Sequence, residues 1–170
     1  VPPGAETLII GTFPSHSKNR DFEFFYPNPK NSFWKIISSL FSHTFQFNIH
    51  EDAVKERKKI ALENKFGLTD MLSKAIREKN GSGDDQLIEI ELMDISLILK
   101  SNPAIKRIIL TSRSGKINTL RLFEKYMTQK QIQFYKTTSE KVITGFFEFE
   151  NRTIKVFVPY SPSPRVIRSY

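Results

Sequence analysis

Apolar positions along this chain follow two periods in turn, one typical of strands and one typical of helices. Residues 7–10, Thr-Leu-Ile-Ile, form a short β-branched run that ends in the loop 11–15, which predicts a buried strand. After Pro29, apolar residues recur at the spacing of a helix packed against a core. They are Phe33, Ile36, Ile37, Leu40 and Phe41. A basic helix is expected next over residues 51–63, then a second strand or strand end at 66–72.

The same alternation continues downstream. Asp94 is a suitable cap for a short helix that Asn102-Pro103 would stop, and residues 107–112 form an apolar run expected to be a third buried strand. Ser114 is expected to cap the next helix. The positions predicted to face inward from that helix are Ile117, Leu120, Phe123 and Met127.

A hairpin is predicted near the end of the sequence. Residues 146–150 and 153–158 alternate between apolar and polar positions on either side of Asn151-Arg152. The second arm of this hairpin runs into a proline-rich loop at residues 159–165.

The order of these elements predicts one domain over residues 1–170. Strands that alternate with helices are typical of an α/β sandwich with a mainly parallel sheet. Ligands of such folds bind beyond the carboxyl ends of the strands, so the loops 11–15 and 159–165 are expected to meet at that edge and form a site.

Composition narrows the classes of function. Hydrophobic residues make up 39% of the chain, and no apolar run approaches the roughly 20 residues that a membrane helix needs. Cysteine is absent, which excludes disulfides, thiol nucleophiles and iron–sulfur clusters, and three scattered histidines do not suggest a metal site. We therefore expect catalysis by oxygen and nitrogen side chains. Without cysteine or a secretory signal, the expected location is intracellular and cytoplasmic.

The charge balance favours a polyanionic partner. Lysine and arginine number 26 against 18 acidic residues, a net charge of +8, although a basic surface can also serve solubility alone. Some basic residues flank the two candidate loops, where they could hold phosphates or simply be solvated charges: Lys18, Arg20, Lys30, Arg165 and Arg168. The denser run at 55–59 is expected to be a solvated helix face.

An aromatic segment, residues 22–34, lies between the first loop and the first helix. Its prolines restrict the loop, and an aromatic ring held this way can stack on a planar base. Most of its rings are expected in the core (Phe22, Phe24, Phe33 and Trp34), which leaves Tyr26 as the ring expected to be exposed in a pocket. Asn31 is placed either to cap the helix or to position water or a base edge through its carboxamide.

Four motifs together resemble those of the uracil-DNA glycosylase superfamily. They are Gly11-Thr12-Phe13-Pro14-Ser15, Tyr26-Pro27-Asn28-Pro29-Lys30-Asn31-Ser32-Phe33-Trp34, Gly67-Leu68-Thr69-Asp70 and Ser161-Pro162-Ser163-Pro164-Arg165. Within the superfamily, the chain looks most like the hypoxanthine-DNA glycosylases and the mismatch-specific uracil-DNA glycosylases. Residues 81–84, Gly-Ser-Gly-Asp, resemble the hypoxanthine branch in particular.

This resemblance implies a three-layer α/β/α sandwich around a central, mainly parallel four-stranded sheet. It implies a monofunctional enzyme of base-excision repair that hydrolyses the N-glycosidic bond of a flipped deaminated base, uracil or hypoxanthine, with no metal or cofactor. The expected partner is damaged or mismatched DNA, single- or double-stranded. We take a monomer as the default state.

The resemblance also assigns roles to residues. Tyr26 becomes the ring that stacks on the base, and Asn31 the catalytic polar group that orients water or base. The pocket floor is assigned to backbone groups of Gly11, Thr12, Phe13 and Pro14. Contacts with DNA are assigned to Lys30, Ser161, Pro162, Ser163, Pro164 and Arg165.

Two departures from the family pattern keep other functions open. Many members carry an Asp or Asn water activator in the first motif, where this chain has Thr12 and Phe13, and some carry a histidine where this chain has Tyr160 and Ser161. One alternative is therefore a catalytically weak or inactive DNA-binding module of the same fold. A nucleotide hydrolase ranks last, because residues 11–15 contain one glycine and do not form a glycine-rich phosphate loop.

Overall fold

Four parallel strands form one side of the main sheet in the computed structural model, which describes residues 1–15, 20–78, 84–138 and 142–163. Their order is β2 (Phe66–Asp70), β1 (Thr7–Gly11), β5 (Arg107–Leu110) and β8 (Arg152–Val158). The antiparallel strand β7 (Ile143–Phe149) and then β6 (Tyr135–Thr138) extend the sheet beyond β8. The mainly parallel sheet is confirmed. It has six strands rather than the expected four.

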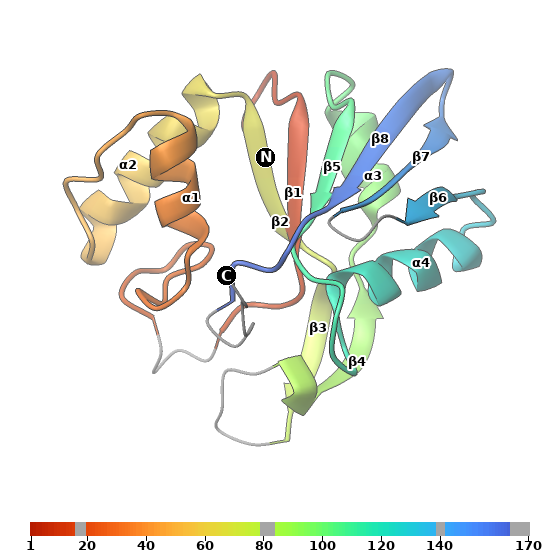
Figure 1. Cartoon of the computed structure of the whole chain (residues 1–170), viewed down its shortest axis with the longest axis horizontal. Coiled ribbons are helices and arrows are strands. Elements are labelled where there is room, and N and C mark those ends of the chain that lie inside the picture. The colour runs from red at the N-terminus through yellow and green to blue at the C-terminus, as the bar shows by residue number, and fades with distance from the viewer. Residues whose placement is uncertain (16–19, 79–83, 139–141, 164–170) are drawn as a thin grey trace.

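Helices cover both faces of this sheet (Figure 1). Helices α1 (Phe33–Leu40) and α2 (His50–Glu63) share one apolar cluster with Ile9, while α3 (Ile95–Ser101) and α4 (Thr119–Gln129) share the other with Leu8 and Ile10. Successive side chains of a strand point to opposite faces, so β1 contributes to both clusters. The three-layer α/β/α architecture is therefore confirmed. None of the helices in the described part of the chain is long and apolar enough to cross a membrane.

The predicted helix caps are partly confirmed. Asp94 caps α3 as expected, because its side chain accepts a hydrogen bond from the Leu97 N–H. Helix α4 begins later than expected, since its cap is Asn118 and not Ser114; the Asn118 Oδ1 accepts from the Arg121 N–H at 3.0 Å. Gly115 has a φ of +94°, which a helix beginning at Ser114 could not accommodate.

The predicted hairpin is present as β7 and β8. Its turn residues are Glu150 and Asn151, with φ values of 47° and 63°, so the turn lies one residue earlier than Asn151-Arg152. Two positive φ values are typical of the tight turns that match the twist of paired strands.

A second, two-stranded sheet was not predicted. The chain leaves β2 at Asp70 and, after one residue, enters β3 (Leu72–Arg77), which pairs with β4 (Leu87–Leu92). The run 66–72 is thus divided between two strands. Figure 1 shows this small sheet beyond the carboxyl ends of the central strands, on the side where the candidate loops lie.

One further prediction was wrong: residues 55–59 are not a uniformly solvated face. Arg57 is 3% exposed because it lies on the same side of α2 as the buried Ala53 and Ile60. Its guanidinium lies over the rings of Phe22 and Phe45, with centroid distances of 4.3 and 4.7 Å.

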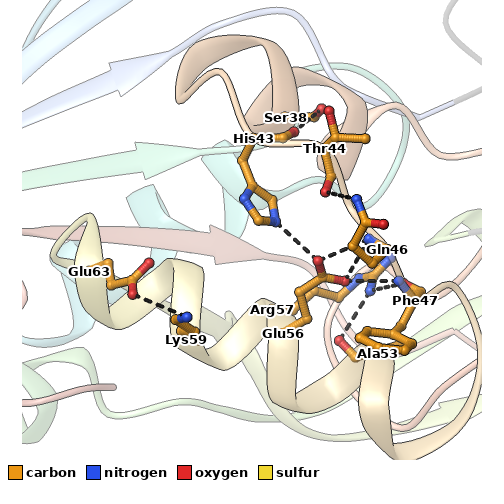
Figure 2. A network of polar contacts seen from close by, with 10 residues as sticks. All are labelled: Ser38, His43, Thr44, Gln46, Phe47, Ala53, Glu56, Arg57, Lys59 and Glu63. Carbon is orange, nitrogen blue, oxygen red and sulfur yellow. Dashed lines mark hydrogen bonds and ion pairs between the residues drawn. The ribbon is translucent and has the colours of Figure 1, made fainter.

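Arg57 and Glu56 together fasten the segment after α1 to α2 (Figure 2). Arg57 donates to the Phe47 carbonyl at 2.8 Å. The Glu56 carboxylate accepts from the backbone N–H groups of Gln46 and Phe47 and lies 3.1 Å from His43 Nε2. This network fixes α2 to residues 43–47, which follow α1. The contacts of Arg57 with Phe22 and Trp34 also hold α2 against the aromatic segment, which forms one wall of the site described next.

Candidate functional site

The separate sequence motifs meet at one cavity of about 820 Å³ at the carboxyl edge of the sheet. Its lining comes from residues 12–15, 20, 23–28, 31, 70, 84, 111–112, 114–115, 117 and 161–163. The Ser32 N–H donates to the Pro162 carbonyl at 2.9 Å, which joins the start of α1 to the last motif. The expected meeting of the two candidate loops is therefore confirmed.

Tyr26 lies in the wall of this cavity. Its ring stacks on Phe33 with centroids 4.1 Å apart, and its hydroxyl donates to Thr111 Oγ1 at 3.1 Å. Burial, together with the nearby Asp70 carboxyl, raises the pKa of Tyr26, so the phenol stays neutral at physiological pH. Its φ of 52° is a strained conformation for a residue with a side chain, which is common at functional sites.

The other aromatic residues divide between core and cavity. Phe22, Phe33 and Trp34 are buried, as expected. Phe24 is partly buried and contributes to both, since it packs against the core cluster and also lines the cavity. The Trp34 indole N–H donates to the Phe25 carbonyl at 2.9 Å, which holds the loop in place.

Asn31 lies one residue before Ser32, which is the N-cap of α1, and also lines the cavity. The Asn31 Oδ1 accepts from the Phe33 N–H at 2.9 Å, so the side chain satisfies the first backbone donor of the helix. No residue in the described part of the chain accepts a hydrogen bond from its amide nitrogen. That Nδ2 group is therefore available to a ligand.

The first motif, residues 11–15, forms the floor of the cavity. Gly11 is buried, and a Cβ there would lie 2.3 Å from Asp70 Oδ1 and 3.0 Å from the Tyr26 hydroxyl, so any larger residue would displace the Asp70 carboxylate. Thr12 is 6% exposed, and its hydroxyl lies 3.2 Å from Thr119 Oγ1 at the start of α4. Phe13 and Pro14 line the cavity.

Asp70 is a site residue that the sequence analysis did not single out. It ends β2, directly beside Gly11 in the sheet register, and lines the cavity. Burial and the nearby Asp84 raise the pKa of Asp70 to about 7, although Arg20 acts in the opposite direction. The sequence feature that could have identified Asp70 is an acidic residue directly after a buried apolar strand, at the edge where such sheets bind ligands.

The residues expected to contact DNA are only partly placed. Ser161, Pro162 and Ser163 line the cavity, and Lys30 is exposed on the loop beside it. Two of the expected contacts, Pro164 and Arg165, lie outside the described residues, as do Lys18 and Arg168.

Arg20 lines the cavity and has two protein partners. It donates to the Ser15 carbonyl at 2.8 Å and pairs with Glu23 at 2.6 Å. Among the described residues, no cluster of His, Asp and Glu side chains could hold a metal ion.

A concave site at the carboxyl edge of a parallel sheet, with an aromatic wall and many polar side chains, is typical of α/β proteins that bind a small or planar ligand. Comparison with known proteins adds a relative. The chain is 30% identical over 110 residues to the hypoxanthine DNA glycosylase of Methanosarcina acetivorans, a match that covers 65% of this chain and 65% of that protein. No protein-family model matches the sequence. No solved structure gives a significant match.

This similarity supports a relationship of the chain to the uracil-DNA glycosylase superfamily, on its hypoxanthine-DNA glycosylase branch. The match spans about two thirds of the relative's length.

Proposed function

We propose that this protein is a DNA glycosylase that removes a flipped deaminated base, uracil or hypoxanthine, from DNA. The observation that carries the proposal is the convergence of Tyr26 and Asn31, from the most specific sequence motif, on one cavity at the carboxyl edge. The similarity to a hypoxanthine DNA glycosylase supports the same activity. A base is too deep in the duplex stack for chemistry, so the enzyme must take it into such a cavity.

The residues of the cavity suit the chemistry of this reaction. As the N-glycosidic bond breaks, the sugar gains oxocarbenium character and negative charge grows on the departing base. Phe33 covers one face of the Tyr26 ring, and the opposite face can stack on the base. The Asn31 amide N–H can donate to an oxygen of the base or of the attacking water.

The charge of the chain suits a DNA partner. A net charge of +8 favours contact with phosphates, which supply most non-specific affinity. We assign these contacts to Lys30 and to the last motif, residues 161–165. The protein would then act inside the cell, where the DNA is.

The test is base release from labelled oligonucleotides that carry uracil, hypoxanthine or xanthine, single- and double-stranded, detected as strand cleavage after alkali. Asn31→Asp keeps an oxygen to accept from the Phe33 N–H but removes the amide donor. We expect it to fold normally and to lose at least about 100-fold in single-turnover rate, because the donor acts on the transition state. Asn31→Ala, which loses both groups, should also lose helix stability.

Asn48→Asp is the matched control, because it makes the same charge change at an exposed position outside the cavity. It should cleave at the unaltered rate. An Asn31→Asp variant as active as the control would contradict the assignment of Asn31.

A second candidate function is an inactive DNA-binding module. The observation that favours it is the burial of Thr12, whose hydroxyl is held by Thr119, beside Phe13, which has no group that could accept a proton. Salt-sensitive DNA binding without cleavage of any of the three lesions would support this module and contradict the glycosylase.

A further inference from the structure

The proposed reaction requires a group that accepts a proton from the attacking water. The first motif cannot supply it, because the Thr12 hydroxyl is engaged with α4 and Phe13 is apolar. Asn31 presents an amide, which does not act as a base near neutral pH. If the site has a general base, that group must lie on another element that lines the cavity.

Asp70 is the carboxylate that occupies the right place. It lies at the end of β2, paired in register with Gly11, so it stands beside the first motif where that motif lacks an acidic residue. The absence of a side chain at Gly11 allows this position, because a Cβ there would overlap Asp70 Oδ1 at 2.3 Å. Gly11 therefore makes room for the carboxylate.

The Asp70 carboxylate is also available to bind a ligand. It lines the cavity, and no residue in the described ranges donates a hydrogen bond to it. The neighbouring Tyr26 hydroxyl donates elsewhere, to Thr111 Oγ1. Asp70 is partly exposed at the cavity wall, and carboxylates largely withdrawn from solvent normally have hydrogen-bond partners, so a ligand or a water in the cavity is the natural partner of this one.

We propose that Asp70 is the general base of the glycosylase reaction, an inference that rests on the proposed function. The carboxylate takes a proton from a water in the cavity as the water oxygen forms a bond to C1′ of the flipped nucleotide. The N-glycosidic bond breaks at the same time, and its electron pair leaves on the base. The proton is then available to neutralise the departing base, so Asp70 is regenerated.

The electrostatic surroundings suit this role. The charged and titratable groups that face Asp70 are Arg20 from the loop before the aromatic segment, Tyr26 from that segment, and Asp84 from the short 3₁₀ helix before β4. Burial and Asp84 together place the pKa of Asp70 at about 7, close to the optimum for a base that acts near neutral pH. The rate of the chemical step should therefore rise with pH and level off above about pH 7.

Single-turnover cleavage of the preferred lesion between pH 5.5 and 9 tests the proposal. Asp70→Asn should lose about 10²–10⁴-fold in rate and lose the pH-dependent rise, while its affinity for the lesion-bearing DNA changes less than about threefold. Asp70→Glu, which keeps a proton acceptor, should recover part of the activity. The matched control Asp52→Asn removes a carboxylate from the exposed start of α2 and should behave as wild type.

A second variant keeps the test decisive if Asp70→Asn fails to fold. Asp84→Asn removes a negative charge that raises the pKa of Asp70, so the rising limb of the profile should move to lower pH. A pH profile of Asp84→Asn whose rising limb coincides with that of the wild type would contradict the proposal.

The outcomes separate this inference from the proposed function. Wild-type cleavage with an unchanged Asp70→Asn rate and profile overturns the role of Asp70 and leaves the glycosylase intact. If the wild-type protein releases none of the lesion bases, both the glycosylase function and the role of Asp70 as its general base are contradicted.

Discussion

A carboxyl group enclosed at the end of β2 affects the stability of the fold as well as the chemistry of the site. The Asp70 carboxyl titrates near 3.8 in a solvated chain and at about 7 in the folded protein. Between these values the folded state binds more protons than the unfolded state, so stability falls as pH rises through this interval. Above about pH 7 the folded protein bears the full cost of the buried charge.

Replacing this charge should stabilise the protein. We expect Asp70→Asn to raise the free energy of unfolding at pH 8 by on the order of 2 kcal/mol, and to have a much smaller effect at pH 4, where the carboxyl is protonated in the folded state and only partly ionised in the unfolded state. Urea denaturation at the two pH values measures this. Equal changes in the free energy of unfolding at the two pH values would contradict the raised pKa of Asp70. A variant that is more stable yet less active is the expected signature of a residue kept for function.

Single residues of the site were predictable to different degrees. Tyr26 and Asn31 stood out because rigid aromatic loops and helix starts leave local patterns in sequence. Asp70 did not, because its importance depends on the register of β1 with β2, which places it beside a glycine distant in the chain. Local sequence carries no record of that pairing.

At the scale of elements, the adjacent residues Glu56 and Arg57 on α2 hold the segment that precedes the helix. Burial opposes ionisation of Glu56, but backbone N–H groups of Gln46 and Phe47 and the His43 ring prevail and hold the pKa of Glu56 below its usual value of 4.5. Its contribution to stability is therefore complete above pH 4.5 and is lost as pH falls through the folded value.

Glu56→Gln should destabilise the protein by about 1–2 kcal/mol at pH 7, because a neutral amide accepts these backbone hydrogen bonds more weakly. The difference from wild type should shrink in acid. Chemical denaturation gives the measurement, with Glu51→Gln as a control: that residue is exposed and pairs with Lys55 at 3.5 Å, so about 0.5 kcal/mol or less is expected. Equal losses in the two variants would show that the network in Figure 2 does not stabilise the fold.

The elements that were predictable are those with strong apolar periods. Helices α1, α2 and α3 and the parallel strands β1, β2 and β5 fall where the patterns indicated, and α4 is present but begins later than expected. Strand β6 was not predicted because its sequence, Tyr-Lys-Thr-Thr, is short and polar. Strands β3 and β4 were not predicted because Lys74 and Glu91 interrupt any apolar run. Their positions are decided by pairing partners rather than by their own composition.

For the whole molecule, the positive charge predicts binding to DNA of any sequence with a strong dependence on salt. We expect the affinity for undamaged DNA to fall at least about tenfold between 50 and 200 mM salt, because each phosphate contact releases counterions. Fluorescence anisotropy of a labelled oligonucleotide measures this. Lys30→Gln should weaken binding to all sequences alike and reduce the salt slope by roughly one contact.

Lys59→Gln is the matched control for this measurement. Lys59 is an exposed residue on α2 that pairs with Glu63 and lies outside the cavity lining. An equal change in slope for both variants would mean that DNA contacts are spread over the surface and are not gathered at the cavity.

The placement of β8 between β5 and β7, together with the Ser32–Pro162 hydrogen bond, has a consequence for biosynthesis. A nascent chain that has not yet released residues 152–163 from the ribosome lacks an interior strand of the main sheet and one side of the cavity. The β6–β7 pair then has nothing to join it to β5, and the aromatic wall has nothing opposite it. Both the fold and the site can therefore be completed only after residues 152–163 have left the ribosome and can pair with the earlier elements.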